Sequence, residues 1–237
     1  MMIKAVTFDL WNTLLENKDF TEPRINSLKR DLEVEGLIFP DSELLRAYDS
    51  ASEYYHREWE LNHSHLSVER RVEHFLTGLG IPFTADLIRS VIGSFMNAYV
   101  VDPPALKEGV EETLEALNGE YRMGIISDTG VTPGSIIRQH LEGHELLHYF
   151  ASTVFSDEVG YCKPDPKVFE KVLNELKVRP EEAVHVGDLL RTDVAGAKGI
   201  GMKAVWVSDT GDYPHGEYSP DFVIMRLPEL LDVIEKM

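Results

Sequence analysis

Four short polar segments of this chain carry side chains that could act together on a small anionic substrate. Each segment follows an apolar run or lies in the loop beyond one; they contain Asp9 and Thr13, Ser127 and Asp128, Lys163, and Asp188 and Asp193. An aspartate can attack an electrophile and form a covalent acyl intermediate. A hydroxyl, main-chain N–H groups and an ammonium group can bind phosphoryl oxygens.

Three of the aspartates could hold a divalent metal ion. Asp9, Asp188 and Asp193 offer the hard oxygen ligands that Mg²⁺ prefers, with room for water and a substrate phosphate. Three carboxylates in one crevice would repel one another unless a cation lay between them. We therefore predict Mg²⁺ as the cofactor.

Alternating strands and helices would bring the four segments together. Apolar runs predict strands at about residues 3–8, 121–126, 153–155, 183–186, 204–207 and 222–224. Helical spacing falls between or after them, at about 110–117, 134–141, 166–176, 192–199 and 227–234. This alternation predicts an α/β fold with a parallel sheet covered on both faces. The carboxyl ends of parallel strands share one edge, so the polar segments should converge on one crevice.

An all-helical region interrupts the alternation after the first strand. Apolar spacing of three and four predicts helices at about 21–35, 41–61, 67–79 and 84–101, and Asp102-Pro103-Pro104 ends this region. We predict one α/β domain formed by residues 1–17 and 104–237, with a helical domain at 18–103 inserted into it.

Composition narrows the range of partners. The net charge is −18 and no basic block occurs, which argues against nucleic acid and anionic membranes as partners. The single cysteine, Cys162, excludes an intrachain disulfide and fits a reducing compartment. No apolar run approaches the roughly 18 residues of a membrane span. We expect a cytoplasmic monomer or homodimer that acts on a small molecule.

The ordered segments resemble the haloacid dehalogenase (HAD) superfamily of hydrolases. The resemblance spans residues 3–17 and 104–237, and two stretches are its most specific parts: Gly160-Tyr161-Cys162-Lys163-Pro164-Asp165-Pro166, and Gly187-Asp188 through Asp193. It implies a Rossmann-like core, and the helical insertion resembles the small helical cap of this family.

The same resemblance implies roles for individual residues. It implies Asp9 as the nucleophile, with Ser127 and Lys163 as phosphoryl-binding groups. It also implies Mg²⁺ bound by Asp9, Asp188 and the main-chain carbonyl of Trp11, with Asp193 in or near the metal shell.

Trp11 departs from the pattern of the HAD phosphatases. They usually carry Asp at this place, which protonates the leaving oxygen and then activates water. Tryptophan cannot titrate, and loss of a general acid–base costs about 10²–10⁴ in rate. A phosphatase with Trp11 should therefore favour good leaving groups, or take a proton from the cap or from Asp128.

Two other interpretations stay open. A 2-haloacid dehalogenase often has an aromatic residue at this place, and a departing halide needs no proton. Against it stand Asp188 and Asp193, because dehalogenases need no metal and uncompensated carboxylates would repel a halide. The third interpretation is a binding or regulatory protein with a weakly active HAD fold. We favour a Mg²⁺-dependent phosphatase that acts on a small phosphorylated metabolite through an aspartyl-phosphate on Asp9.

Overall fold

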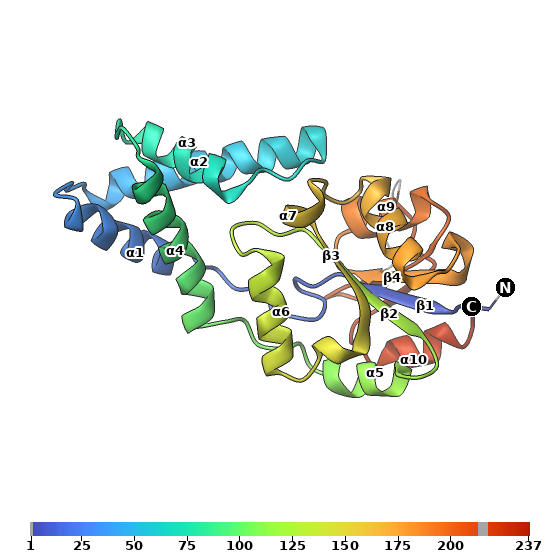
Figure 1. The fold of residues 1–237 in the computed structure, drawn as a ribbon. Coiled ribbons are helices and arrows are strands. Elements are labelled where there is room, and N and C mark those ends of the chain that lie inside the picture. Colours follow the sequence, from blue (N-terminus) through green and yellow to red (C-terminus); the bar gives the residue numbers. More distant parts are fainter. Residues whose placement is uncertain (1, 213–217) are drawn as a thin grey trace.

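A parallel sheet forms the centre of the computed structural model, which describes residues 2–212 and 218–237 (Figure 1). The sheet is six-stranded, in the order β3-β2-β1-β4-β5-β6, and every neighbouring pair is parallel. The strands are β1 (Ala5–Phe8), β2 (Arg122–Ser127), β3 (Phe150–Phe155), β4 (Ala183–Gly187), β5 (Lys203–Val207) and β6 (Phe222–Ile224). The predicted α/β class with a parallel sheet is confirmed.

The first strand lies in the middle of the sheet and positions Asp9. All four residues of β1 are buried, as expected for a parallel strand covered on both faces. Its last residue, Phe8, pairs with Ile125 of β2 and Val186 of β4. The chain first extends the sheet on the β2 side and later on the β4 side. Asp9 therefore follows β1 at the switch point where open α/β sheets bind ligands.

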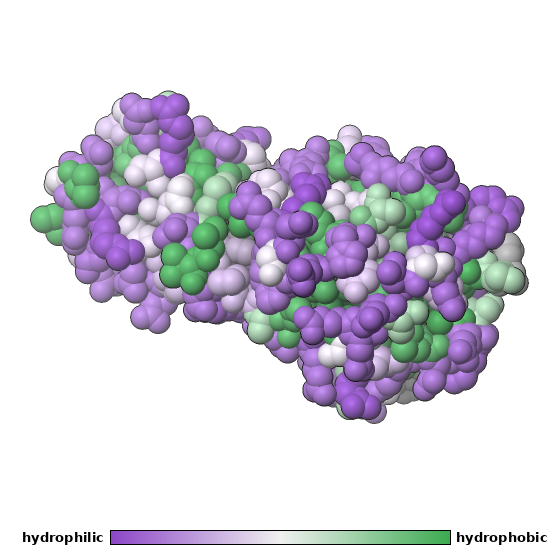
Figure 2. Space-filling view, turned by 60° about the horizontal axis from the view of Figure 1, so that its bottom comes forward, coloured by the Kyte–Doolittle hydropathy of each residue, from purple (hydrophilic) through white to green (hydrophobic). Residues whose placement is uncertain are grey.

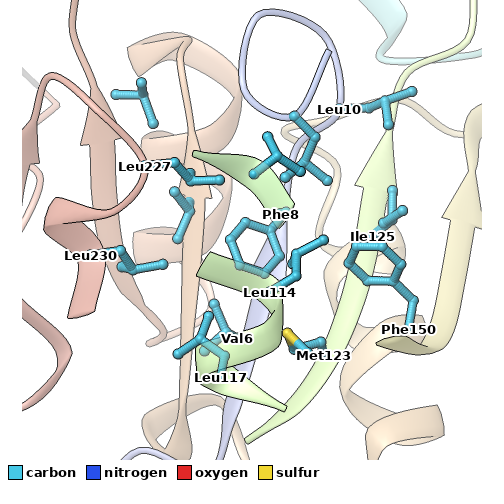
Figure 3. Close-up of a cluster of buried hydrophobic side chains, with 14 of the residues drawn as sticks. Val6, Phe8, Leu10, Leu114, Leu117, Met123, Ile125, Phe150, Leu227 and Leu230 are labelled. Carbon is cyan, nitrogen blue, oxygen red and sulfur yellow. The ribbon is translucent and has the colours of Figure 1, made fainter. Parts of the chain in front are cut away.

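Helices cover both faces of this sheet (Figure 1). They are α5 (Val110–Leu117), α6 (Gly134–Gly143), α7 (Ser156–Val159), α8 (Pro166–Leu176), α9 (Ala195–Gly199) and α10 (Glu229–Ile234). On one face, Phe8 and Ile125 pack with Leu114 of α5 and Leu230 of α10 (Figure 3). On the other face, α8 and α9 bury a second apolar cluster. Burial from both sides holds β1 and β4 rigidly beneath the polar segments that follow them.

The inserted helices have an apolar core of their own. They are α1 (Thr21–Val34), α2 (Asp41–Asn62), α3 (Val68–Gly78) and α4 (Ala85–Val101). These helices bury a cluster that includes Leu28, Leu44 and Phe75 and is separate from the clusters on the sheet. In Figures 1 and 2 they form the lobe at the left, joined to the larger lobe that contains the sheet. We refer to α1–α4 as the helical insertion; it lies within the predicted range 18–103.

Short elements differ from the prediction. The helix expected at 192–199 is a wide π turn at Leu190–Val194 followed by α9, because the Asp193 carboxylate accepts a hydrogen bond from the main-chain N–H of Leu189. Strand β3 begins at Phe150 rather than 153, since Ala151 and Ser152 carry little strand signal. The four-residue helix α7 has no counterpart in the prediction, because so short a segment shows no periodicity.

None of the helices in the described parts of the chain combines the length and the apolar character that crossing a membrane requires.

Candidate active site

An ion-paired cluster lies beyond the carboxyl ends of β1 and β4. Lys163 Nζ lies 2.5 Å from Asp9 Oδ1 and 2.6 Å from Asp193 Oδ1, and the exposed fractions of Lys163, Asp9 and Asp193 are 3%, 4% and 1%. Asp188 completes the group, because single carboxylate oxygens of Asp9, Asp188 and Asp193 all lie within 4.8 Å of one another. The fold thus brings together four residues that the sequence separates into three segments.

The charges of this cluster do not balance. Burial raises the pKa of Asp9 well above its ordinary value; Lys163 opposes this shift, and the Asp193 and Asp188 charges reinforce it. Burial alone would lower the pKa of Lys163, but attraction to Asp193 and Asp9 outweighs it, so the pKa of the ammonium is raised. Lys163 therefore stays protonated and offsets one of three carboxylate charges. A divalent cation beside these oxygens would offset the remainder.

Asp193 is held from several sides. Its Oδ1 accepts hydrogen bonds from Lys163 and from His185 Nε2, the latter at 3.1 Å, and its Oδ2 accepts from the main-chain N–H of Leu189 at 2.9 Å. The second ring nitrogen of His185 lies 2.9 Å from Thr7 Oγ1. A Cβ at Gly187 would collide with the Asp193 carboxylate, which explains the glycine before Asp188. Asp193 is therefore well placed to orient Lys163.

Two predicted substrate-binding hydroxyls are buried without a partner. Ser127 Oγ and Thr13 Oγ1 form no hydrogen bond with any described residue. A buried polar atom without a partner costs free energy, so such atoms in a native protein call for an explanation. Ser127 ends β2 beside β1, and Thr13 follows Asp9 by four residues. Oxygens of a bound phosphoryl group would give both hydroxyls an acceptor.

Asp188 has a more open environment than the other two aspartates. It is half-buried, and its Oδ2 accepts a hydrogen bond of 3.2 Å from Asn12 Nδ2. Asn12 has a positive φ of 55° and is itself bonded through Oδ1 to Lys107 Nζ at 3.2 Å. Burial and the charge of Asp193 raise the pKa of Asp188. Sequence reasoning missed Asn12 and Lys107, whose contact with the site depends on the turn after β1.

Trp11 and Asp128 connect the site to the helical insertion. Trp11 Nε1 donates to the main-chain oxygen of Asp128 at 3.0 Å, and its ring packs edge-on against Tyr99 of α4. The Asp128 carboxylate accepts from the main-chain N–H of Lys163 and from Trp59 Nε1, each at 3.0 Å. Both Asp128 oxygens are thus engaged by protein donors. The predicted substrate-binding residue Asp128 therefore links α2 to the Lys163 segment in this structure.

A cavity of about 320 Å³ opens beside Lys163. Lys163, Trp59 and Arg191 are among its lining residues. The Arg191 guanidinium stacks over the Trp59 ring at 4.6 Å and pairs with Glu60 Oε1 at 2.9 Å. This volume lies within the range of small-molecule sites, and its walls come from both lobes.

Comparison with known proteins places these features in a family. The family model for haloacid dehalogenase-like hydrolases matches residues 3–201. The glyceraldehyde 3-phosphate phosphatase of Pyrococcus furiosus is 31% identical over 99% of this chain and 94% of its own length. The glyceraldehyde 3-phosphate phosphatase of Methanopyrus kandleri is 29% identical over 100% of this chain and 99% of its own length.

Solved structures agree with this relationship. A 2-haloacid dehalogenase from Pseudomonas syringae pv. Tomato DC3000 superposes with a TM-score of 0.76, 26% identity and 99% coverage of both chains. A HAD phosphatase from Thermococcus onnurineus superposes with a TM-score of 0.67, 27% identity and 98% coverage of both chains. With the parallel sheet and the aspartate–lysine cluster at its edge, these matches show that the chain belongs to the haloacid dehalogenase-like family of hydrolases.

Proposed function

We propose that this hydrolase is a Mg²⁺-dependent phosphatase that acts on a small phosphorylated compound. The observation that carries the proposal is the group of three carboxylates, Asp9, Asp188 and Asp193, gathered around a single lysine. Such a group suits a bound cation and a phosphoryl group. Release of a halide needs no metal, and uncompensated carboxylates would repel the departing anion. The relatives named glyceraldehyde 3-phosphate phosphatase support the same choice.

The reaction would proceed through Asp9. Its Oδ1 is held by Lys163, and no described residue donates to its Oδ2, which leaves that oxygen available for attack. Attack on phosphorus forms an aspartyl-phosphate and breaks the bond to the leaving oxygen, which takes up a proton from solvent water. Water then attacks the aspartyl-phosphate, releases inorganic phosphate and restores the Asp9 carboxylate.

The other residues would bind and stabilise the phosphoryl group. Lys163 supplies a positive charge, and the hydroxyls of Ser127 and Thr13 supply donors that no described residue occupies. Mg²⁺ bound by Asp9, Asp188 and the main-chain carbonyl of Trp11, with Asp193 in or near its shell, would offset the charge that the phosphoryl group brings. Asp193 would chiefly orient Lys163.

A 2-haloacid dehalogenase is the second candidate. Trp11, which cannot supply a proton, and the similarity to the Pseudomonas syringae dehalogenase favour it. Asp9 would then attack the carbon that bears the halogen, break the carbon–halogen bond and release halide, and water would hydrolyse the resulting ester. A binding or regulatory protein that retains the metal site is the third. The cytoplasmic location and the monomeric or homodimeric state stay predictions.

Paired assays separate the three candidates. A panel of phosphate monoesters, beginning with glyceraldehyde 3-phosphate, is incubated with Mg²⁺ or with EDTA while phosphate release is measured. Chloride release from 2-chloropropionate is measured in EDTA beside it, with Asp9→Asn as the inactive control. Mg²⁺-dependent phosphate release is the expected result. Chloride release in EDTA without phosphate release would instead establish the dehalogenase. If neither phosphate nor chloride is released and Mg²⁺ binding is measurable, the result would favour the binding protein.

A further inference from the structure

A second cavity, of about 370 Å³, lies between the helical insertion and the sheet domain. Trp11 and Asp128 form part of its wall, and Arg24, Tyr55 and Arg71 of the insertion form another part. Asp128 also accepts a hydrogen bond from the main-chain N–H of Lys163, so the wall of this cavity is bonded to the segment that carries Lys163. The leaving group of a phosphate ester bound at Asp9, which is its alcohol portion, could extend along Trp11 into this cavity.

Arg71 is a buried cation in this cavity, while Asp128, an acidic residue of the same wall, directs its two carboxylate oxygens to Trp59 Nε1 and to the main-chain N–H of Lys163. Its exposed fraction is 9%; its Nη2 donates to Ser52 Oγ at 3.1 Å, and its guanidinium carbon lies 4.7 Å from the centroid of the Tyr55 ring. Within residues 2–212 and 218–237, no carboxylate oxygen lies within 4.0 Å of its nitrogens. A buried charge of this kind is costly unless something pairs with it.

Arg24 is half-buried in the wall of the same cavity; hydrogen bonds from Thr21 and, to a smaller degree, the charge of Arg24 lower the pKa of the nearby Asp19. It donates to the main-chain oxygen of Phe95 at 3.5 Å and to Tyr48 Oη at 3.4 Å, and no carboxylate oxygen of the described residues lies within 4.0 Å of its nitrogens. Burial lowers the pKa of the Arg71 guanidinium, and the positive charge of Arg24 acts in the same direction. Two guanidinium groups that repel each other thus share one cavity.

The missing partners are not explained by a shortage of acidic residues. The chain has 41 acidic and 23 basic residues. Lys18, which lines the same cavity, pairs with Asp102 at 2.5 Å, and Arg191 beside the first cavity pairs with Glu60. In so acidic a chain, two guanidinium groups at one cavity that form no ion pair with any described residue are best explained by an anion that a ligand brings.

We propose that Arg71 and Arg24 bind a carboxylate at the far end of the leaving group. The preferred substrates are then phosphate monoesters of small hydroxy acids, rather than esters of neutral alcohols or aldehydes. The planar fork of a guanidinium matches a carboxylate through two parallel hydrogen bonds. This specificity rests on the proposed phosphatase function and names the substrate class for it.

Substrates matched in length test this specificity. The value of kcat/KM is measured for 3-phosphoglycerate, glyceraldehyde 3-phosphate and glycerol 3-phosphate, with ethylene glycol bisphosphate as a second anionic probe. We expect 3-phosphoglycerate to be preferred over both neutral compounds by about 10–100-fold, the range of hydrogen bonds to charged groups. Equal or better hydrolysis of the two esters without a carboxylate would overturn this inference, while it would still support the proposed phosphatase function. Preference for the bisphosphate would show that the two arginines bind a phosphate group, and it would overturn the proposal that they bind a carboxylate.

Variants test the two arginines directly. In Arg71→Gln and Arg24→Gln, the preference for 3-phosphoglycerate over glyceraldehyde 3-phosphate should fall, chiefly through KM, while Arg71→Lys should retain part of it. The exposed neighbour Arg70→Gln is the matched control and should keep the full preference. A purely structural role of Arg71 would lower both activities equally and leave their ratio unchanged, which would overturn the proposal.

Binding gives a readout that does not need turnover. Calorimetry on Asp9→Asn should show tighter binding of 3-phosphoglycerate than of glycerol 3-phosphate, and Arg71→Gln should remove this difference. If no ester is hydrolysed, the phosphatase proposal fails. The same calorimetry then decides whether the arginines bind the carboxylate, because equal affinities for both compounds would contradict it.

Discussion

Lys163 joins two aspartates whose surroundings differ. Every oxygen of Asp193 accepts a hydrogen bond from the protein, and the attraction of Lys163 and His185 outweighs burial, so the pKa of Asp193 is lowered. Asp9 has one bonded oxygen, and burial raises its pKa. Oδ2 of Asp9 accepts no hydrogen bond from a described residue, which fits the proposed role of Asp9 as the nucleophile. The fully bonded carboxylate of Asp193 fits its proposed role of orienting Lys163.

Replacement of Asp9 tests this division. Asp9→Asn retains the shape of the side chain but removes the attacking carboxylate, so we expect kcat to fall by about 10³-fold or more. Steady-state phosphate release with Mg²⁺ measures the loss. Asp165→Asn, in the loop after Lys163, is the control and should change kcat little. Activity of Asp9→Asn within tenfold of the original chain would exclude Asp9 as the nucleophile.

Trp11 predicts how the rate depends on the leaving group. Its indole bonds to the main-chain oxygen of Asp128 and cannot donate a catalytic proton. The rate should therefore fall steeply as the pKa of the leaving alcohol rises, and aryl phosphates should exceed alkyl phosphates by about 10²–10⁴, the value of general acid catalysis. A series of aryl and alkyl phosphates measures this slope.

Two variants of Trp11 separate the ability of the side chain to donate a proton from its packing. Trp11→Asp should raise activity on alkyl phosphates and flatten the dependence on the leaving group, whereas Trp11→Phe, which cannot titrate either, should retain the steep slope. Equal rates on aryl and alkyl phosphates in the original chain would show that another residue already supplies the proton.

At the scale of elements, the helical insertion is bound to the segment that carries Lys163. The turn after α2 pairs with this segment: the main-chain N–H of Cys162 donates to the oxygen of His63 at 2.7 Å, and that of His65 donates to the oxygen of Gly160 at 3.1 Å. Trp59 near the end of α2 adds its bond to Asp128. The position of α2 and the position of Lys163 are therefore coupled through the main chain.

A second junction joins α4 to α6 and should respond to pH. Tyr99 Oη lies 2.5 Å from His140 Nδ1. Burial, with a smaller effect of His144, lowers the pKa of His140 from 6.5 to about 4. Below pH 6.5 the unfolded chain takes up a proton that the folded chain resists. The free energy of unfolding should thus decrease as the pH falls from about 6.5 toward 4, by roughly 1–2 kcal/mol for this partly buried group.

Urea unfolding across this pH range measures the effect. His140→Gln has no titrating ring, so its stability should decrease less between pH 6.5 and 4 than that of the original chain. His148→Gln, at an exposed position, is the control and should follow the original chain. Identical pH profiles for all three proteins would rule out His140 as the source.

At the scale of the whole molecule, the site lies where two separately packed lobes meet. The sheet domain and the helical insertion each bury their own apolar cluster, and both cavities have walls from both lobes. The aspartates and Lys163 come from the sheet domain, while Trp59, Arg24 and Arg71 come from the insertion. The proposed chemistry would therefore use groups of one lobe, and the proposed recognition of the substrate would use groups of both.

Metal binding should stabilise the whole molecule. The charge of the aspartate cluster exceeds what Lys163 offsets, so a cation that binds only the folded chain adds to its stability. At about 100 times its Kd, Mg²⁺ should raise the free energy of unfolding by about 2.7 kcal/mol, and the Tm by roughly 5–10 °C for a chain of this size.

Thermal unfolding with Mg²⁺ or EDTA tests this. Asp188→Asn should lose most of the Mg²⁺-dependent shift, because it removes a ligand charge from the cluster. Asp232→Asn, on the exposed side of α10, is the control and should retain the full shift. A Tm of the original chain that is the same in both solutions would contradict a metal site at these aspartates.

Much of this protein could be predicted from residues that are close in the sequence. Continuous apolar runs predicted the buried strands, and regular spacing predicted the long helices, because both patterns reflect local geometry. Parallel strands also bring their carboxyl ends to one edge, which is why Asp9, Ser127, Lys163 and Asp188 could be grouped before any contact was known. The π turn at Leu190–Val194 could not be predicted in this way, since it depends on the hydrogen bond between the Asp193 carboxylate and the main-chain N–H of Leu189.

The sequence by itself thus determined the α/β class, the inserted helices and the types of side chain available for chemistry. Only the tertiary structure decided their partners. Lys163 reaches Asp9 across 154 positions of the chain, Trp11 reaches Asp128 across 117, and Arg24 shares a cavity with Arg71. Such contacts depend on how whole elements pack, and no local pattern records which side chains two packed surfaces will bring within a few ångströms.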